Sequence, residues 1–299
     1  MQKAEKNENI YPTKKYKLSV CKICGHTVWT NIEEEMPDDY VCRFCKAPKK
    51  AFISFGTEAF NNVLHEFIHL ADGIFYIKQN PPFAEPFIHN AYFIENEKGN
   101  ILFDTPMFLN KSLLDEIEKR GGVKYIIHSH SHFLGASRLL CERFNSVSYL
   151  GKEEKPIEGN LNYPDYWMNE DRYELPDDNG RILIKKFPGH TPASYIMEIK
   201  RGKLTLLTGD SLYINCPSNT NLSNIFLFSE KENLDPEKLD KLYELNLDYI
   251  GTNSGFVKNA QYYLNQLKIS EKPTSNPFDK KLKAGVLIDR EDTLCGRTF

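Results

Sequence analysis

The sequence of 299 residues lacks long apolar runs, and none comes near the ~20 residues that a membrane-spanning helix needs. Its polar first residues contain no apolar core of a secretion signal. Charge is nearly balanced, since 38 lysines and arginines face 41 acidic residues, for a formal net charge of −3. Such a balance gives no electrostatic footprint for nucleic acid or for a membrane surface. We therefore expect a cytoplasmic protein with neither kind of partner.

Cysteine is scarce, and its seven copies cannot all pair in disulfides because their number is odd. Four of them form two Cys-x-x-Cys pairs, Cys21 with Cys24 and Cys42 with Cys45. Two such pairs at this spacing are typical of a tetrahedral four-thiolate site for iron or zinc. The alternative is a zinc knuckle that only stabilises a module too small for its own core. The remaining cysteines, which we interpret as buried inert thiols, are Cys141, Cys216 and Cys295.

Histidine is almost as scarce, yet three of its eight copies, His128, His130 and His132, fall within five residues. A short β-branched run precedes them, and a glycine followed by an apolar-periodic segment comes after them. We therefore expect a loop between a buried strand and a helix, where open α/β sheets place their ligand sites. Neutral imidazole is the commonest metal ligand, and alternate residues of an extended loop point the same way. A His-x-His pair in this loop can therefore bind one metal ion.

Two later strand ends carry further candidate ligands. One predicted strand ends in Pro-Gly, which places His190 on a turn, and another ends in Thr-Gly, which places Asp210 directly after a glycine. A carboxylate in such a position is otherwise a common turn former. No histidine follows His190, and Asn253, after the last predicted strand, offers only an amide, which is a poor ligand for zinc or iron.

Taken in chain order, these segments resemble the motifs of the metallo-β-lactamase superfamily. His128 and His130 match the start of its His-x-His-x-Asp-His loop, and residues 208–210 match its Thr-Gly-Asp strand end. Residues 188–194 resemble its Pro-Gly-His-Thr-x-Gly-Ser turn, with Ala193 in the place of the glycine. The resemblance covers about residues 60–270. It implies an α+β fold, the αββα sandwich of that superfamily, here preceded by a small four-cysteine metal module.

The resemblance also implies roles for single residues, with two departures in the loop. His132 stands where the superfamily has aspartate, and Phe133 where it has a histidine for a second metal. We expect one firmly held ion, iron or zinc, with a second ion weak or absent. We predict His132 and Asp210 as catalytic residues, with His132 alternatively a second-site ligand or a partner of a ligand. The metal ligands implied at this site are His128, His130, His190 and Asp210.

The segment before the loop resembles the hairpin that opens the superfamily's fold. Short strands are expected between residues 64 and 104, followed by an amphipathic helix over 109–120. Asp104 falls at the family's strand-end aspartate, and the resemblance implies that it supports the metal loop. His89, near a predicted strand end, is a weaker candidate ligand.

Residues 16–52 resemble a rubredoxin-like module of the short kind joined to other redox domains. Its Cys-Lys-Ile-Cys-Gly run matches the first knuckle, while Arg43 replaces the usual proline and Lys46 the usual glycine of the second. The resemblance implies one iron that cycles between ferric and ferrous, with zinc left open by the four-thiolate geometry. We predict a tail and rubredoxin-like domain over 1–54, and a metallo-β-lactamase-like domain with a C-terminal tail over 55–299.

Three functions follow from these sites. The first is a metal-dependent oxidoreductase in which the rubredoxin-like iron centre passes electrons to the His/Asp site. It resembles the flavodiiron arrangement, although the flavodoxin-like glycine-rich segment is missing. The second is a hydrolase of thioesters, esters or lactams that uses metal-activated water, and the third is a binding or sensing module without catalysis. We place redox first, with a small-molecule substrate and a redox partner protein. A homo-oligomer stays open.

Overall fold

The chain folds into two compact units, which are described in turn. The N-terminal unit holds the described residues up to Leu150 together with 164–168, and the C-terminal unit holds 151–154 and the described residues from Asn169 on. No helix in the described part of the chain is long and apolar enough to cross a membrane. The computed structural model describes residues 5–6, 15–43, 45–82, 90–154, 164–175, 181–215, 222–227, 236–270 and 286–295.

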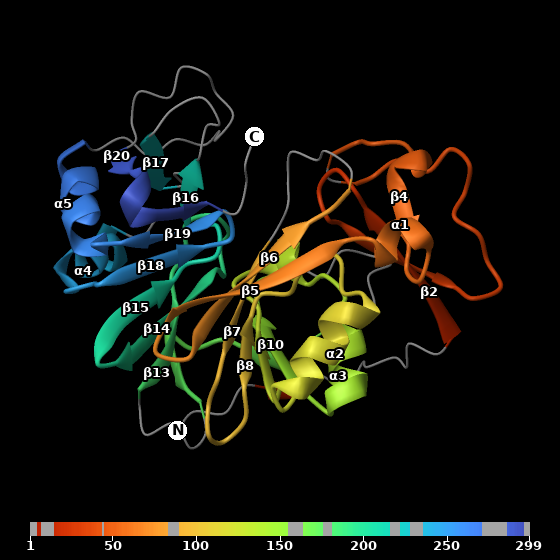
Figure 1. Ribbon diagram of the computed structural model, residues 1–299, viewed down its shortest axis with the longest axis horizontal. Coiled ribbons are helices and arrows are strands. Elements are labelled where there is room, and N and C mark those ends of the chain that lie inside the picture. The colour runs from red at the N-terminus through yellow and green to blue at the C-terminus, as the bar shows by residue number, and fades with distance from the viewer. Residues whose placement is uncertain are drawn as a thin grey trace. The chain divides into compact units, whose positions relative to one another are not determined.

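The N-terminal unit is built on an eight-stranded sheet in the order β1-β11-β10-β9-β8-β7-β6-β5 (Figure 1). Strands β5 to β8 pair antiparallel, whereas β8, β9 and β10 run parallel. The residues of β7, β8 and β9 are all buried, as expected for central strands covered on both faces. The bounds are β1 Glu5–Lys6, β5 Leu64–Ala71, β6 Ile74–Asn80, β7 Ala91–Ile94, β8 Ile101–Phe103, β9 Tyr125–Ile127, β10 Val147–Gly151 and β11 Tyr166–Met168.

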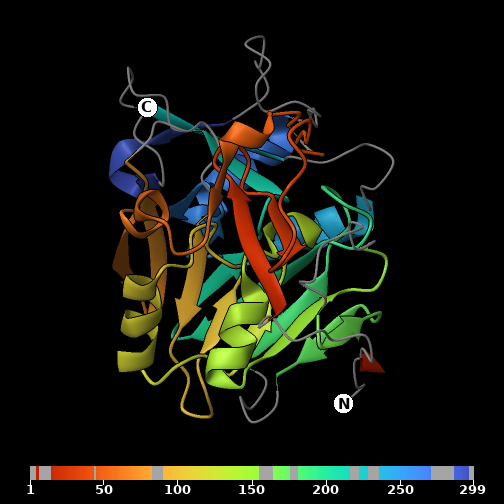
Figure 2. The same cartoon turned by 90° about the vertical axis from the view of Figure 1, so that its right-hand side faces the viewer.

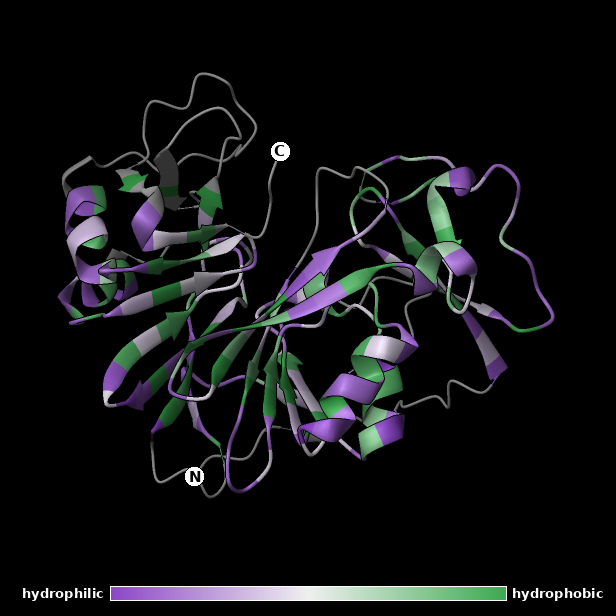
Figure 3. Ribbon diagram, viewed as in Figure 1, coloured by the Kyte–Doolittle hydropathy of each residue, from purple (hydrophilic) through white to green (hydrophobic). Residues whose placement is uncertain are grey.

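Two helices, α2 (Lys111–Lys119) and α3 (Ser137–Phe144), lie side by side against this sheet (Figure 2). Asn110 caps the start of α2, where its side chain accepts a hydrogen bond from the amide of Leu113. Arg143 joins the two helices through ion pairs with acidic residues of α2. Hydrophobic and hydrophilic residues alternate along both helices (Figure 3), and the buried residues of α2 include Leu113 and Ile117. The strands and the helix predicted between residues 64 and 120 are thus confirmed, apart from residues 83–89, including His89, which lie outside the described ranges.

A three-stranded sheet, in the order β3-β2-β4, carries the four cysteines and belongs to the same unit. Its strands are β2 (Tyr16–Cys21), β3 (Thr27–Asn31) and β4 (Phe52–Ser54), followed by the short helix α1 (Glu58–Asn61). The side chains that join this sheet to the larger one form a common hydrophobic core. That core includes Leu18, Val20, Trp29, Phe60, Ile77, Phe93 and Leu109.

The C-terminal unit contains a seven-stranded sheet in the order β12-β13-β14-β15-β18-β19-β21 and a three-stranded sheet in the order β16-β17-β20. Helices α4 (Pro236–Glu244) and α5 (Ala260–Ser270) pack on a core to which Leu206, Ile250 and Leu264 contribute. The strands are β12 Arg172–Glu174, β13 Ile182–Lys186, β14 Tyr195–Arg201, β15 Lys203–Leu207, β16 Leu212–Asn215, β17 Leu222–Leu227, β18 Tyr249–Thr252, β19 Gly255–Lys258, β20 Val286–Asp289 and β21 Thr293–Cys295.

Candidate metal centres

The three clustered histidines follow the buried strand β9 and lead, through a short 3-10 turn at Ser131–Phe133, into α3. The predicted strand–loop–helix setting is therefore confirmed. The side chains of His128 and His130 are buried, whereas that of His132 is exposed. Two of the three imidazoles thus have the low solvent exposure expected of ligands, and the third is accessible to solvent.

A short hydrogen-bond chain fixes the orientation of His130. The carboxylate of Asp104 accepts the backbone N–H of Ser129 at 2.7 Å and its hydroxyl at 2.8 Å. The same hydroxyl oxygen lies 2.9 Å from Nδ1 of His130. Because the Ser129 hydroxyl donates its proton to Asp104, its oxygen accepts the N–H of His130 Nδ1. The lone pair of the neutral His130 ring is then on Nε2. Outer partners of this kind orient metal-binding histidines in many proteins.

Asp104 adopts a strained backbone to make these contacts. Its φ is +59°, in the left-handed region that non-glycine residues rarely enter, and its side chain is fully buried. Such strain costs ~1–3 kcal/mol and persists where surrounding contacts demand it. The predicted support of the metal loop by Asp104 is confirmed by its bonds to Ser129.

His128 is a fully buried imidazole, and neither ring nitrogen has a hydrogen-bond partner of normal geometry among the described residues. Burial lowers the pKa of His128 to about 4, although the backbone of Phe133 and the charge of Asp165 oppose this shift. The ring is therefore neutral at physiological pH. A buried polar atom without a partner is costly, so neutral nitrogens in this state suit a bound cation.

The ring of His132 lies beside that of His130, with centroids 4.7 Å apart and planes at 74°. The ring of Phe133 packs against His130 as well, at 4.5 Å, and is 2% exposed. The residue in the family's second-metal position is therefore a packing partner of His130. The expectation of a single firmly held ion stays a prediction.

The four cysteines come together as the spacing predicts, with all four sulfur atoms within 4.8 Å of one another. Cys21 Sγ lies 3.7 Å from Cys45 Sγ, and Cys24 Sγ lies 3.5 Å from Cys42 Sγ. A tetrahedral ion with ~2.3 Å metal–sulfur bonds would place its sulfurs about 3.8 Å apart. The sulfur positions therefore fit one tetrahedral ion, iron or zinc.

The two cysteine knuckles repeat the same hydrogen bonds. In the first, Cys21 N donates to the carbonyl of His26 and Gly25 N donates to the carbonyl of Cys21, both at 2.8 Å. In the second, Cys42 N donates to the carbonyl of Ala47 at 2.7 Å, and Lys46 N donates to the carbonyl of Cys42 at 2.9 Å. Two equivalent turns thus present two sulfurs each.

Burial and crowding make free thiolates unfavourable in this module. Hydrogen bonding from Cys24 lowers the pKa of Cys21, but the contact with Cys42 and burial outweigh it and raise it to about 12. The contacts with Cys21 and Cys42, together with burial, also raise the pKa of Cys24. A bound cation is what allows four such sulfurs to be deprotonated together.

The backbone of Lys46, which stands where rubredoxin-like modules usually have glycine, is strained. Lys46 has φ +61°, while Gly25, its equivalent in the first knuckle, has φ +76°. A side chain in this left-handed region costs roughly 1–2 kcal/mol. We expect Lys46→Gly to stabilise the protein by about 1 kcal/mol after the added chain entropy of glycine is subtracted.

This prediction is checked by urea unfolding of the metal-loaded protein. Lys46→Ala is the matched control, because it removes the bond from Lys46 Nζ to the carbonyl of Arg43 but keeps a Cβ at positive φ. An equal gain in both variants would show that the backbone conformation is not the cause.

In the C-terminal unit, the structure brings His190 and Asp210 together. His190 Nε2 lies 3.8 Å from Asp210 Oδ2, and their side chains are only 10% and 14% exposed. His190 lies in the loop after β13, and Asp210 follows β15 through Gly209, whose φ of +57° favours glycine. Asn253 is buried, and its backbone N–H donates to the carbonyl of Gly209 at 3.4 Å. The two predicted ligands therefore lie within ion-pair distance of each other, and their role as metal ligands stays a prediction.

The three cysteines outside the four-cysteine site were predicted to be buried, inert thiols. Cys141 is 4% exposed, and burial with the nearby charge of Asp165 raises its pKa to about 12, which confirms an unreactive thiol. Cys216 and the side chain of Cys295 lie outside the described part. The Ser129 link between Asp104 and His130 was not predicted, since serine between two histidines carries no sequence signal of its own.

The sequence model of the metallo-beta-lactamase superfamily matches residues 84–251, more than half of the chain. The chain therefore belongs to the metallo-beta-lactamase superfamily. The predicted fold class is confirmed: the chain has the mixed α/β fold of that superfamily, with four close cysteines near its N-terminus.

The chain is also similar in sequence to one curated protein and in fold to solved metallo-beta-lactamase structures. The uncharacterized protein YmaE of Bacillus subtilis (strain 168) is 25% identical over 150 residues, which are 49% of this chain and 53% of YmaE. The chain thus spans about half the length of the curated relative it matches. The crystal structure of VMB-1 superposes with a TM-score of 0.50 and 14% identity, over 68% of this chain and 94% of VMB-1. The subclass B3 metallo-beta-lactamase BJP-1 of Bradyrhizobium japonicum gives a TM-score of 0.41 and 18% identity, over 74% of this chain and 87% of BJP-1.

Proposed function

We propose that this chain is a metal-dependent oxidoreductase that receives electrons at the four-cysteine module and uses them at the histidine site. The module is proposed to be rubredoxin-like and to hold iron. The proposed ligands of the second ion are His128, His130, His190 and Asp210. A protein electron donor and a small-molecule acceptor complete the proposal.

The observation that carries this proposal is the placement of the four cysteines in the unit that bears the histidine loop. Leu18, Val20 and Trp29 of the cysteine-bearing sheet share one hydrophobic core with the larger sheet. The cysteine-bearing sheet and the histidine loop thus belong to one compact unit, which supports electron exchange between the two sites.

The donor sets suit the proposed chemistry. When bound, iron in the four-cysteine site would supply a one-electron carrier, and iron at the histidine site would supply a second redox centre, whereas zinc there would supply only a Lewis acid. The chain's own residues orient this chemistry. Asp104 and Ser129 keep Nδ1 of His130 protonated, the Phe133 ring excludes water from one side of His130, and exposed His132 can move a proton.

The test is stopped-flow reoxidation of protein reduced without oxygen, with dioxygen, nitric oxide and hydrogen peroxide as acceptors. We expect His190→Ala to retain the visible band of the four-cysteine site. Reoxidation by the true acceptor should slow by more than the ~10–100-fold that changes in outer partners of a metal ligand cause. His69→Ala, an exposed histidine on β5, is the matched control. Equal reoxidation rates in His190→Ala and the parent would contradict electron use at the histidine site.

A second candidate function is hydrolysis of a thioester, ester or lactam. The exposed imidazole of His132, beside His130, favours it, because an accessible base in the superfamily's aspartate position can accept a proton from an attacking water. Turnover of such substrates by the zinc-loaded protein, lost in His132→Ala and in His190→Ala, would support hydrolysis in place of redox chemistry.

A further inference from the structure

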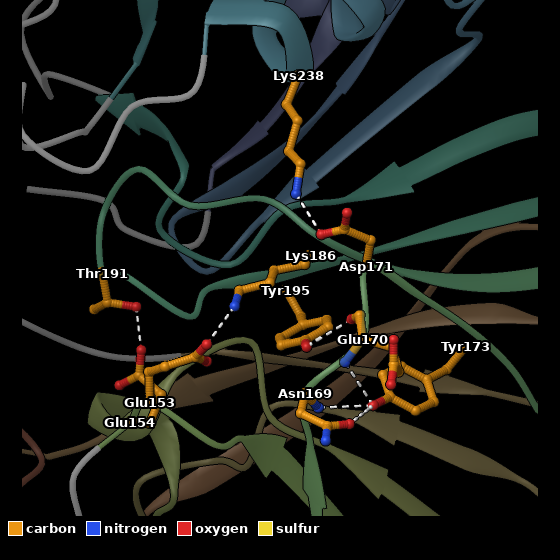
Figure 4. Close-up of polar contacts among 10 residues, drawn as sticks. All are labelled: Glu153, Glu154, Asn169, Glu170, Asp171, Tyr173, Lys186, Thr191, Tyr195 and Lys238. Carbon is orange, nitrogen blue, oxygen red and sulfur yellow. Dashed lines mark hydrogen bonds and ion pairs between the residues drawn. The ribbon is translucent and has the colours of Figure 1, made fainter. Parts of the chain in front are cut away.

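The carboxylate of Glu154 lies buried in the C-terminal unit, just after β10, and is 4% exposed. It accepts a hydrogen bond from the hydroxyl of Thr191, the residue directly after His190 (Figure 4). A buried carboxylate loses hydration that only strong hydrogen bonds replace. Most buried positions hold apolar side chains, so a carboxylate at this position suggests a role for its contact with Thr191.

The loop that bears His190 is tied together by hydrogen bonds around Thr191. The amide of Thr191 donates to Ser194 Oγ at 3.0 Å, and its hydroxyl lies 2.7 Å from the same oxygen. The amide of Phe187 donates to the carbonyl of Ser194 at 2.7 Å, and that of Gly189 donates to Thr191 at 3.2 Å. These bonds close the loop on itself. They do not fix it to another segment, whereas the Glu154 contact does.

The same segment touches the loop at a second point. A Cβ added to Gly151 would lie 2.4 Å from the carbonyl oxygen of Ala193 and 2.8 Å from its Cβ. The backbone at Gly151 therefore passes directly against the loop, three residues before Glu154. Two independent contacts, one steric and one polar, thus hold the His190 loop to residues 151–154.

We propose that Glu154 is a positioning residue for His190, acting through the hydroxyl of Thr191. This inference rests on the proposed role of His190 as a metal ligand. Thr191 is itself 8% exposed and adjacent to His190, so its hydroxyl bond restricts the backbone that carries the imidazole. Residues that orient a ligand from outside the metal's own contacts commonly change metal affinity by ~10–100-fold.

The neighbouring carboxylate supplies a matched control. Glu153 pairs with Lys186 at 2.6 Å, but the side chain of Glu153 is 47% exposed. An ion pair open to water contributes little to stability. Figure 4 shows the two adjacent carboxylates reaching different partners, Glu153 toward Lys186 and Glu154 toward Thr191. Only the second partner lies next to a proposed ligand.

The first measurement is hydrogen–deuterium exchange of residues 187–195 in metal-free protein, which needs no assumption about metal. We expect Glu154→Ala to speed exchange there by about tenfold, as local opening becomes easier. Glu154→Gln, whose amide oxygen can still accept from Thr191, should restore slow exchange, and Glu153→Ala should leave it unchanged. Thr191→Val should match Glu154→Ala, and the double variant should add little to either.

The second measurement is the affinity for cobalt, followed by its visible spectrum. Glu154→Ala should bind cobalt at the histidine site ~10–100-fold more weakly than the parent, with Glu154→Gln within a few-fold. Unchanged exchange at residues 187–195 in Glu154→Ala would overturn the positioning role, whatever the metal result. If exchange is faster in Glu154→Ala but the parent protein binds no cobalt at the histidine site, the contact between Glu154 and Thr191 stands. The proposed ligand role of His190 is then contradicted instead.

Discussion

Cys42→Ser is expected to remove the metal ion from the four-cysteine site and to open the two knuckles. The apolar cluster around the sulfurs is small, with Cys21, Cys42 and Ala51 as its buried members. The bound ion must therefore supply most of the local stability, as it does in small metal modules, where binding is worth roughly 10 kcal/mol or more. Metal analysis should show the loss of one ion per chain. Hydrogen exchange should rise in residues 21–26 and 42–51.

The shared core sets a limit to this opening. Leu18 and Trp29 pack in the core of the larger sheet, so β2 and β3 should keep slow exchange in Cys42→Ser. Cys141→Ser is the control, because it changes another buried cysteine and its hydroxyl can keep the contact with Asp165. Retention of the full metal content by Cys42→Ser would contradict a four-thiolate site.

Gly151→Ala is expected to destabilise the protein by about 3 kcal/mol and to weaken metal binding at the histidine site. The new Cβ would lie 2.4 Å from the carbonyl oxygen of Ala193, a backbone atom that can only move together with the His190 loop. Overpacking a close contact costs ~1–3 kcal/mol, and displacement of a backbone segment places this change at the upper end. Urea unfolding midpoints and cobalt titration measure the two effects.

Two variants separate the steric cause from others. Gly56→Ala places a Cβ in open space but at φ +82°, so it should cost only about 1 kcal/mol and leave cobalt binding unchanged. Ala193→Gly, added to Gly151→Ala, removes the contact at 2.8 Å but leaves the carbonyl contact, and should therefore restore only part of the loss. Full stability of Gly151→Ala would show that the loop has room to move.

The features that could be predicted from the sequence are those with a local signal. The Cys-x-x-Cys pairs define their own site because two residues between cysteines suit a single turn, and the four sulfurs do meet. The histidine loop follows a β-branched strand whose burial is visible in its composition. Asp210 follows Gly209, whose φ of +57° in this turn favours glycine. In each case, the chemistry and the backbone signal lie within a few residues of one another.

The remainder depends on contacts between distant segments, which no local pattern shows. Asp104 reaches Ser129 across 25 residues, and Glu154 reaches Thr191 across 37. Both carboxylates are buried, and the place of Asp104 at the histidine loop could be predicted from the family resemblance but not from a local pattern. The common core of the cysteine-bearing sheet and the larger sheet was equally invisible, because Leu18 and Trp29 alternate as in any half-buried strand. The predicted domain boundary between residues 54 and 55 stays a prediction.

The most direct test of electron transfer as the function is the metal content and visible spectrum of protein purified without oxygen and then oxidised in air. We expect about two iron atoms per chain and a red chromophore that a reductant bleaches, as four thiolates around ferric iron produce. The histidine variant His190→Ala should lose one of these irons and keep the chromophore. A colourless protein with zinc in both sites would contradict the redox function and leave hydrolysis as the function to pursue.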